Sequence, residues 1–318
     1  RGEEKTCPAL AFTRPVFYGA PVRELRALTI YFAVVFLGAA LLAPWIYHGF
    51  QAAAQAFPGL RGLASQPFHR YVSRSLMLLA LLGLWPLLRS LGVRSWKGIG
   101  ITSLWPQLPA VFFGLGLGLA SLATVAILGV VTGGRTLTLG LFGMKLLHHL
   151  AAAARSSLVA IPEELLFRGV LYTRLRAALG DGAGLCLSSL IYAILHFFAR
   201  PESPSHVEWD SGIEVLRQMS AGFLNGRALV PGFLTLTLGG IILSWLFRST
   251  GSLYGPMALH AAWILWLKLY EAATAGSGGQ ATWVWGTSKL IDGWSAFVMM
   301  LCCAAIVRQW SSKRRPSP

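Results

Sequence analysis

Residues 162–168 read Pro-Glu-Glu-Leu-Leu-Phe-Arg, and they interrupt a largely apolar run that extends from 146 to 176. Glu163 and Glu164 are adjacent, and Arg168 follows Glu164 by four residues. An ionisable side chain in the middle of a bilayer costs on the order of 3 kcal/mol even on the insertion scale that gives the smallest penalty. Because of this cost, charged residues inside an apolar run indicate a functional site in a membrane-embedded fold.

The composition is that of an integral membrane protein. Of the 318 residues, 55% are hydrophobic and 12% are charged, whereas a soluble domain carries about 25% charged residues. The formal net charge is +15, but Lys and Arg cluster in short segments between apolar runs, as membrane orientation requires. Because no basic surface with interleaved aromatic residues is visible, we expect the lipid bilayer, and no nucleic acid, as a partner.

Eight apolar runs have about the length that crosses a bilayer. They predict an all-α, polytopic membrane helix bundle with eight transmembrane helices. Some of the runs carry polar residues on one side, which is typical of helices that face the interior of a bundle. The runs are 27–47, 72–91, 108–132, 146–176, 183–199, 231–248, 252–270 and 290–308.

The segments between the runs differ in charge. When they are assigned to alternate sides, one set holds most of the Arg and Lys residues, and the other set, which includes the loop 200–230, holds most of the loop carboxylates. The positive-inside rule then places both termini in the cytoplasm, which requires an even number of helices, as eight is. The cation-rich set comprises the N-terminus, 89–107, 168–182, 248–252 and the C-terminal tail.

Two short patterns predict further helical features. Ile213, Leu216, Ser220 and Phe223 fall at helical spacing in the outer loop and predict a short helix on the outer surface. Gly114 and Gly118 form a GxxxG pattern in the third run, and the ordinary meaning of this pattern is a close approach of two helices.

The charged stretch leaves one carboxylate without a partner. On a helix, Glu164 and Arg168 are at positions i and i+4 and form an ion pair, whereas Glu163 projects about 100° away. Pro162 has no N–H to donate, so it kinks the helix or begins a new segment, and backbone polar groups are exposed beside Glu163. An ion-paired packing motif is the alternative; a second, unpaired carboxylate favours chemistry.

Two histidines lie well inside other apolar runs, His196 in the fifth and His260 in the seventh. Counted from the nearest cytoplasmic segment at about 1.5 Å per residue, Glu163, His196 and His260 come about 14 to 21 Å from the inner face. A single histidine at such depth is more often a hydrogen-bonded interior residue. Three ionisable groups at similar depth on three helices predict a common site.

These residue types predict hydrolysis. A buried carboxylate with a nearby imidazole can hold and deprotonate a water, and a second imidazole can donate to the oxyanion that forms when the water attacks a carbonyl. No serine has a recognisable nucleophile context, and no cysteine is placed near a histidine by the sequence, so covalent catalysis is disfavoured. We expect no cofactor and no metal.

The first motif resembles that of the CPBP family of intramembrane proteases, also called the CAAX prenyl endopeptidase or ABI family. The EExxxR motif of that family is matched by Glu163, Glu164 and Arg168, with the usual Phe167 and Gly169. The resemblance covers roughly residues 145–270.

The other two family motifs are matched with departures. The FxxxH motif is matched by Tyr192 and His196, with tyrosine in place of phenylalanine. The HxxxN or HxxxD motif has His260, but Ile264 occupies the position of the Asn or Asp. One expected donor is therefore missing, and the only asparagine of the chain, Asn225, lies in the outer loop.

The resemblance implies a role for each matched residue. Glu163 is the general base, His196 helps to hold the water, His260 donates to the oxyanion, and Glu164 with Arg168 is the supporting pair. The family implies a metal-independent glutamic endopeptidase, a conical interior cavity, and a membrane-anchored or lipidated protein or peptide substrate with a CAAX-like or C-terminal sorting signal. We expect a multi-pass protein of the bacterial cytoplasmic membrane.

The same resemblance divides the chain into three regions. Residues 1–144 form an N-terminal region with three transmembrane helices, 145–272 form the CPBP-like catalytic core, and 273–318 contain the last transmembrane helix and a basic cytoplasmic tail.

Three alternatives remain open. Glu163, His196 and His260 are also a ligand set known from zinc peptidases, which predicts a zinc-dependent hydrolase. The departure at Ile264 is compatible with a non-catalytic membrane binding or immunity protein that retains the fold. Buried Glu and His residues also mark the proton pathways of transporters.

Overall fold

The computed structural model describes residues 20–138, 144–198, 201–221, 226–276, 281–287 and 289–314. Regular structure in these ranges is almost entirely helical, which confirms the all-α membrane bundle. Asn225, the first 19 residues and the end of the basic tail lie outside the described residues.

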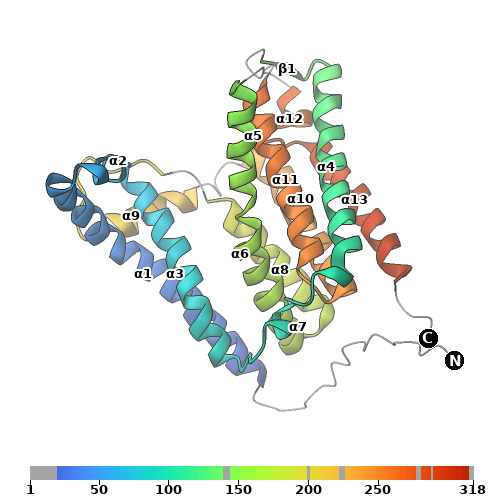
Figure 1. Cartoon of the computed structure of the whole chain (residues 1–318), viewed down its shortest axis with the longest axis horizontal. Coiled ribbons are helices and arrows are strands. Elements are labelled where there is room, and N and C mark those ends of the chain that lie inside the picture. Colours follow the sequence, from blue (N-terminus) through green and yellow to red (C-terminus); the bar gives the residue numbers. More distant parts are fainter. Residues whose placement is uncertain are drawn as a thin grey trace.

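Two long helices form an inclined antiparallel pair at one side of the molecule (Figure 1). They are α1 (Ala20–Ala56) and α3 (Phe68–Ser90), joined by η1 (Pro58–Leu60) and α2 (Arg61–Ala64). The short helix α9 (Ser211–Ser220) packs against both through Val215 and Met219, which are buried with Ala43, Phe68 and Val72. A helix is thus present in the predicted loop, but Ile213, one of the residues that predicted it, is exposed, and Phe223 lies outside the described residues.

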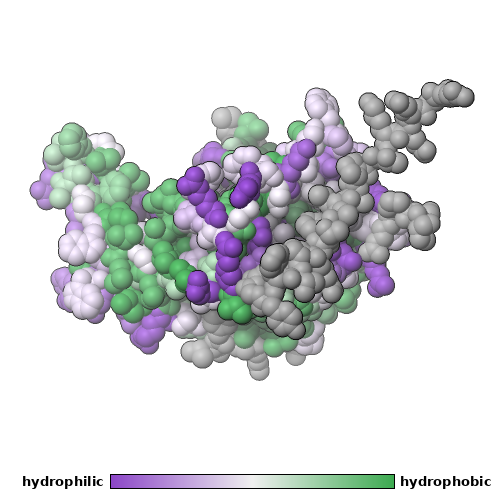
Figure 2. Space-filling model, turned by 90° about the horizontal axis from the view of Figure 1, so that it is seen from below, coloured by the Kyte–Doolittle hydropathy of each residue, from purple (hydrophilic) through white to green (hydrophobic). Residues whose placement is uncertain are grey.

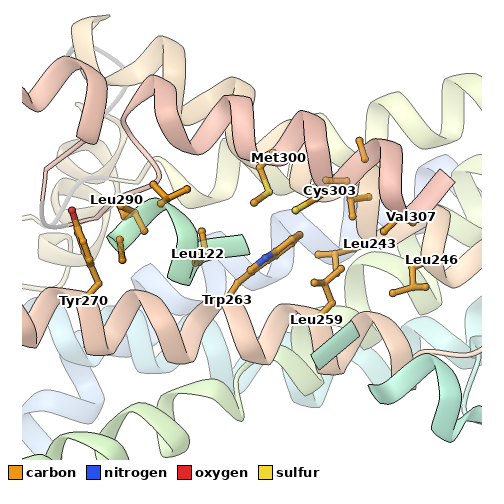
Figure 3. Close-up of a cluster of buried hydrophobic side chains, with 14 residues drawn as sticks. Leu122, Leu243, Leu246, Leu259, Trp263, Tyr270, Leu290, Met300, Cys303 and Val307 are labelled. Carbon is orange, nitrogen blue, oxygen red and sulfur yellow. The ribbon is translucent and has the colours of Figure 1, made fainter. Parts of the chain in front are cut away.

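The other long helices stand side by side as an upright bundle (Figure 1). Leu122, Leu243, Leu259 and Cys303, one from each of four helices, meet in a common core around Trp263 (Figure 3). This core fixes α11, the helix that carries His260. The bundle comprises α4 (Leu108–Val131), α5 (Met144–Ser157), α10 (Gly226–Thr250), α11 (Tyr254–Ala273) and α13 (Trp294–Ser312).

The GxxxG pattern brings α4 into close contact with α11. A Cβ atom on Gly114 would lie 2.5 Å from the carbonyl oxygen of Gly255, and one on Gly118 would lie 2.6 Å from the Cβ of Ala262. Only glycine permits this approach. The predicted close packing is confirmed, and it joins the predicted N-terminal region to the predicted core.

The apolar run 146–176 is not one helix. It consists of α5, α6 (Ala160–Glu164), the π-helix η4 (Leu165–Tyr172) and α7 (Thr173–Leu179). Pro162 is the third residue of α6, where a missing N–H breaks no helical hydrogen bond, so it belongs to a new segment. The chain then turns at Gly180 into α8 (Asp181–His196).

Segments 89–107, 168–182 and 248–252, which are predicted on the cytoplasmic side, lie at the lower end in Figure 1, where η2 (Trp96–Ile99) and η3 (Trp105–Gln107) connect α3 to α4. The N–H of Leu253 donates to the carbonyl of Gly100 at 2.9 Å, and Asp181 forms ion pairs with Arg176 and Arg248. Figure 2 shows this end with hydrophilic side chains gathered near its middle. The assignment of this end to the cytoplasm stays a prediction.

The opposite end carries a small sheet that the sequence analysis did not predict. Strand β1 (Arg135–Leu137) pairs antiparallel with β2 (Thr274–Gly276), and Thr136 lies opposite Ala275. The buried guanidinium of Arg135 donates to the side chain of Thr274. The short helix α12 (Ala281–Trp285) follows β2.

The number of eight membrane spans is not confirmed. Each predicted run overlaps helical structure, but five helical stretches in the described residues are long and apolar enough to cross a membrane. Helix α8 is apolar but only 16 residues long. The five stretches are Val22–Ala56, Phe68–Ser90, Trp105–Val131, Leu229–Thr250 and Trp294–Ser312. The eight-span count and the division into three regions stay predictions.

Candidate active site

The first part of the site is built on the change from α-helix to π-helix. Glu163 and Glu164 end α6, and Arg168 lies in η4. The hydroxyl of Thr173 donates to the carbonyl of Arg168 at 2.9 Å, and a Cβ on Gly169 would lie 2.8 Å from the carbonyl oxygen of Ile99. Short π-helical segments are frequent at functional sites because they redirect side chains within a helix. The glycine after Arg168 allows this segment to lie against η2.

A buried cluster of three charged or polar groups forms the back of the site. Arg168 Nη1 donates to Glu164 Oε1 at 2.7 Å, and Nδ1 of His260 lies 2.8 Å from the same oxygen. All three side chains are at most 5% exposed. A second nitrogen of Arg168 lies 3.5 Å from the carbonyl oxygen of Gly240 in α10. The predicted ion pair is present, and Glu164 also holds His260 on α11, a contact that the sequence analysis did not predict.

The open side of the site is formed by Glu163 and two imidazole nitrogens. Glu163 Oε2 lies 3.7 Å from His196 Nε2 and 3.8 Å from His260 Nε2. The side chains of Glu163 and His196 are 26% and 29% exposed, whereas His260 is 5% exposed. The structure therefore brings all five predicted residues together, with Glu163 and His196 accessible and the other three behind them.

The hydrogen bonds at the far nitrogens fix which atoms face Glu163. Nδ1 of His196 donates to the carbonyl of Tyr192 at 2.8 Å, and Nδ1 of His260 donates to the Glu164 carboxylate, because both partners can only accept. In the neutral form, each Nε2 is then an acceptor. Three acceptor atoms, Glu163 Oε2 and two Nε2, face one another at distances too long for a direct hydrogen bond.

His260 Nε2 lies 3.3 Å from the Tyr192 hydroxyl, whereas Glu163 Oε2 and His196 Nε2 require a donor or a cation between them. Glu163 Oε2 is buried and has no hydrogen-bond partner among the groups that the structure describes. Buried polar atoms of this kind call for a water or another ligand. A water about 2.8 Å from both Glu163 Oε2 and His196 Nε2 fits beside these two atoms, which are 3.7 Å apart. Its two O–H groups can donate to both atoms. The arrangement can hold a water at the carboxylate.

Tyr192 is part of the site, although the sequence analysis assigned it no role. Its hydroxyl lies 3.3 Å from His260 Nε2, and its ring centroid lies 4.5 Å from the guanidinium carbon of Arg168 and 4.3 Å from the ring of His196. Phe167 packs against it edge to face. The signal in the sequence was the tyrosine that stands where the FxxxH motif has phenylalanine.

Two expected features are not part of this geometry. Ile264 is partly buried on α11, one turn after His260, and it brings no polar atom. Two cavities, of about 700 and 250 Å³, lie elsewhere, along α1 and α3. Tyr47 and Phe68 are among the residues that line the first, and Phe50 and Tyr71 are among those that line the second. A conical cavity around the site stays a prediction.

The metal alternative can be compared with the same distances. Zinc binds nitrogen and oxygen ligands at about 2.0 to 2.2 Å in nearly tetrahedral geometry. Within the ranges that the structure describes, no group of three His, Cys, Asp or Glu side chains is arranged to hold a metal ion.

The comparison with known families agrees with the motifs. Residues 144–266 match the family model described as type II CAAX prenyl endopeptidase Rce1-like. No curated protein and no solved structure matches the chain. The matched segment begins with α5 and includes all five predicted site residues, and the match supports peptide-bond hydrolysis, because the family is one of proteases. Residues 144–266 of this integral membrane protein thus match, and are similar to, the Rce1-like family of type II CAAX prenyl endopeptidases.

Proposed function

We propose that this protein is a glutamate-dependent intramembrane endopeptidase that cleaves a membrane-anchored or lipidated protein near its C-terminus, in the bacterial cytoplasmic membrane. One observation carries the proposal. Glu163 Oε2, buried and without a protein partner among the described groups, faces the Nε2 atoms of His196 and His260. A carboxylate and two imidazoles in this arrangement support activation of a water.

The hydrolytic step follows from these groups. Glu163 takes a proton from the water, the water oxygen bonds to the substrate carbonyl carbon, and the carbonyl electron pair moves to the oxygen. The oxyanion then reforms the carbonyl, the C–N bond breaks, and the amine nitrogen receives the proton from Glu163. His196 helps to orient the water. Glu164 and Arg168, both fully buried, keep His260 in place.

The direct test is replacement of the base. We expect Glu163→Gln to lower kcat by about 10² to 10⁴, the range of general-base contributions. The probes are internally quenched peptides in proteoliposomes, one ending in a farnesylated CAAX sequence and others carrying C-terminal membrane anchors. Glu214→Gln is the matched control, because Glu214 lies on the exposed face of α9. Full activity of the Glu163 variant would overturn the base assignment, and an intact biological function without Glu163 would favour a non-catalytic binding protein.

A zinc-dependent hydrolase is the second candidate, and one observation favours it. Both histidines donate Nδ1–H to an oxygen and point Nε2 at Glu163, the orientation that histidines have at zinc sites. Elemental analysis of the purified protein separates the two candidates. Stoichiometric zinc that is lost from a Glu163→Gln variant would support the metal enzyme, whereas cleavage that persists in chelator would support the metal-independent one.

A further inference from the structure

The polar environment of His260 contains a group that the family motifs do not include. Among the described residues that hydrogen-bond His260, Tyr192 alone carries an O–H, and this hydroxyl lies 3.3 Å from Nε2. The side chain is 4% exposed, and its ring is held by Arg168, Phe167 and His196. A buried tyrosine hydroxyl fixed in this way is presented at the side of His260 that faces Glu163.

The same side of the site lacks a donor. Ile264 follows His260 by one helical turn, where the HxxxN or HxxxD motif places a polar side chain. His260 does not replace this donor while it is neutral, because its single N–H points to Glu164 and its Nε2 is an acceptor. To donate from Nε2, the imidazole has to carry a second proton.

We propose that the Tyr192 hydroxyl replaces the missing donor and is a catalytic residue that stabilises the oxyanion. This inference rests on the proposed endopeptidase function. In the resting enzyme, the hydroxyl donates to His260 Nε2. When the substrate carbonyl oxygen gains the electron pair, it is a stronger acceptor than a neutral imidazole nitrogen, and the O–H turns to it. The proton stays on the tyrosine, so the proton balance of the hydrolytic step is unchanged.

The two departures from the family motifs then compensate for each other. Phenylalanine in the second motif and an amide or carboxyl side chain in the third are replaced by Tyr192 and Ile264, so the donor moves from α11 to α8. The ring of Tyr192 keeps the packing position of a phenylalanine against Phe167 and Arg168. Only the position of the polar atom changes.

The test removes the hydroxyl and then restores the family arrangement. We expect Tyr192→Phe to lower kcat by about 10²-fold with little change in KM, as the loss of one oxyanion donor does. Tyr192→Phe combined with Ile264→Asn should recover most of this loss. Tyr31→Phe is the matched control, because it removes a buried hydroxyl that donates to the carbonyl of Ala80, away from the site.

Activity outcomes separate this inference from the proposed function. If the wild type cleaves a probe, Glu163→Gln does not, and Tyr192→Phe retains the wild-type kcat, the role of Tyr192 is overturned and the endopeptidase stands. A double variant as slow as Tyr192→Phe overturns the replacement of the amide. If the wild type cleaves none of the probes, the endopeptidase proposal fails and this inference fails with it.

A second measurement needs no substrate. In protein labelled with ¹⁵N-histidine, the Nε2 resonance of His260, assigned with a His260→Gln variant, should move toward the value of an unbonded acceptor when Tyr192 becomes Phe. Tyr31→Phe should leave it unchanged. An unmoved resonance in Tyr192→Phe overturns the inference, because the hydroxyl is then not on this nitrogen.

Discussion

Glu164 Oε1 binds His260 Nδ1 at 2.8 Å across 96 positions of the sequence, while Arg168 holds the same oxygen at 2.7 Å. The second glutamate of the pair, at the end of α6, therefore links Arg168 in η4 to His260 in α11. The two adjacent carboxylates therefore have different roles. Glu164 is fully buried and orients the histidine, and Glu163, which has only longer contacts, stays available for the water.

We expect the two glutamates to differ in their effect on stability. Glu164→Gln leaves the buried guanidinium of Arg168 without its anion, so the thermal midpoint in detergent should fall clearly. It should also lower kcat about 10- to 100-fold, because partners that orient a catalytic histidine contribute this much. Glu163→Gln should lower kcat by about 10² to 10⁴ and leave the thermal midpoint unchanged. Equal midpoints for the two variants would contradict the division of roles.

The ion pair itself predicts a non-additive result. Arg168→Met should destabilise the protein by about 3 to 5 kcal/mol, the cost of leaving one partner of a buried pair uncompensated, whereas Arg168→Met with Glu164→Leu should recover much of the stability. Tryptophan fluorescence during chemical denaturation measures both. The control is Arg217→Met in the exposed Glu214–Arg217 pair, which should not change the transition. If the two substitutions lower the stability additively, the loss of stability in Arg168→Met does not come from breaking the ion pair.

Spacing rules explain which parts of the site the sequence predicted. The Glu164–Arg168 pair follows from i,i+4 geometry, and the common depth of Glu163, His196 and His260 follows from counting residues along helices. The contact of Glu164 with His260 was not predicted, because it depends on how α6 and α11 face each other. The rotation of a helix about its axis is set by packing partners that no local pattern specifies.

The fold shows the same limit. Apolar runs located the helices, and Gly114 with Gly118 correctly indicated close packing in the membrane. The division of the run 146–176 into four segments was foreseen only at Pro162. The π-helix has no hydropathy signal, since the change from i+4 to i+5 bonding leaves the apolar pattern nearly intact. The pairing of β1 with β2 was missed because six residues carry too short an alternation.

The contact between α4 and α11 predicts that helix packing away from the active site affects the rate of cleavage. Gly118→Val places side-chain atoms where Ala262 and the carbonyl of Leu259 already lie, so α11 has to move, and His260 moves with it. We expect a lower thermal midpoint and at least about a tenfold loss of kcat, since a shift of about 1 Å at a catalytic group can cost 10²-fold. Gly116→Val is the matched control in the same helix, because a Cβ there meets nothing within 4 Å. Equal behaviour of the two variants would contradict the proposed coupling.

The orientation in the membrane can be tested from the two ends of the molecule. Ser312 lies at the end of α13, and Ser205 lies in the loop before α9, whose neighbour Ser203 contacts His69 at the start of α3. In a variant without the native cysteines, Ser205→Cys should react with a membrane-impermeant maleimide added to intact spheroplasts, and Ser312→Cys should react only after permeabilisation. The reason is the excess of Arg and Lys in the segments on the side of Ser312. Both sites are exposed in the structure, so unequal burial does not explain a difference. Labelling of Ser312→Cys in intact spheroplasts would reverse the assignment, and equal labelling of both sites would contradict an odd number of spans between them.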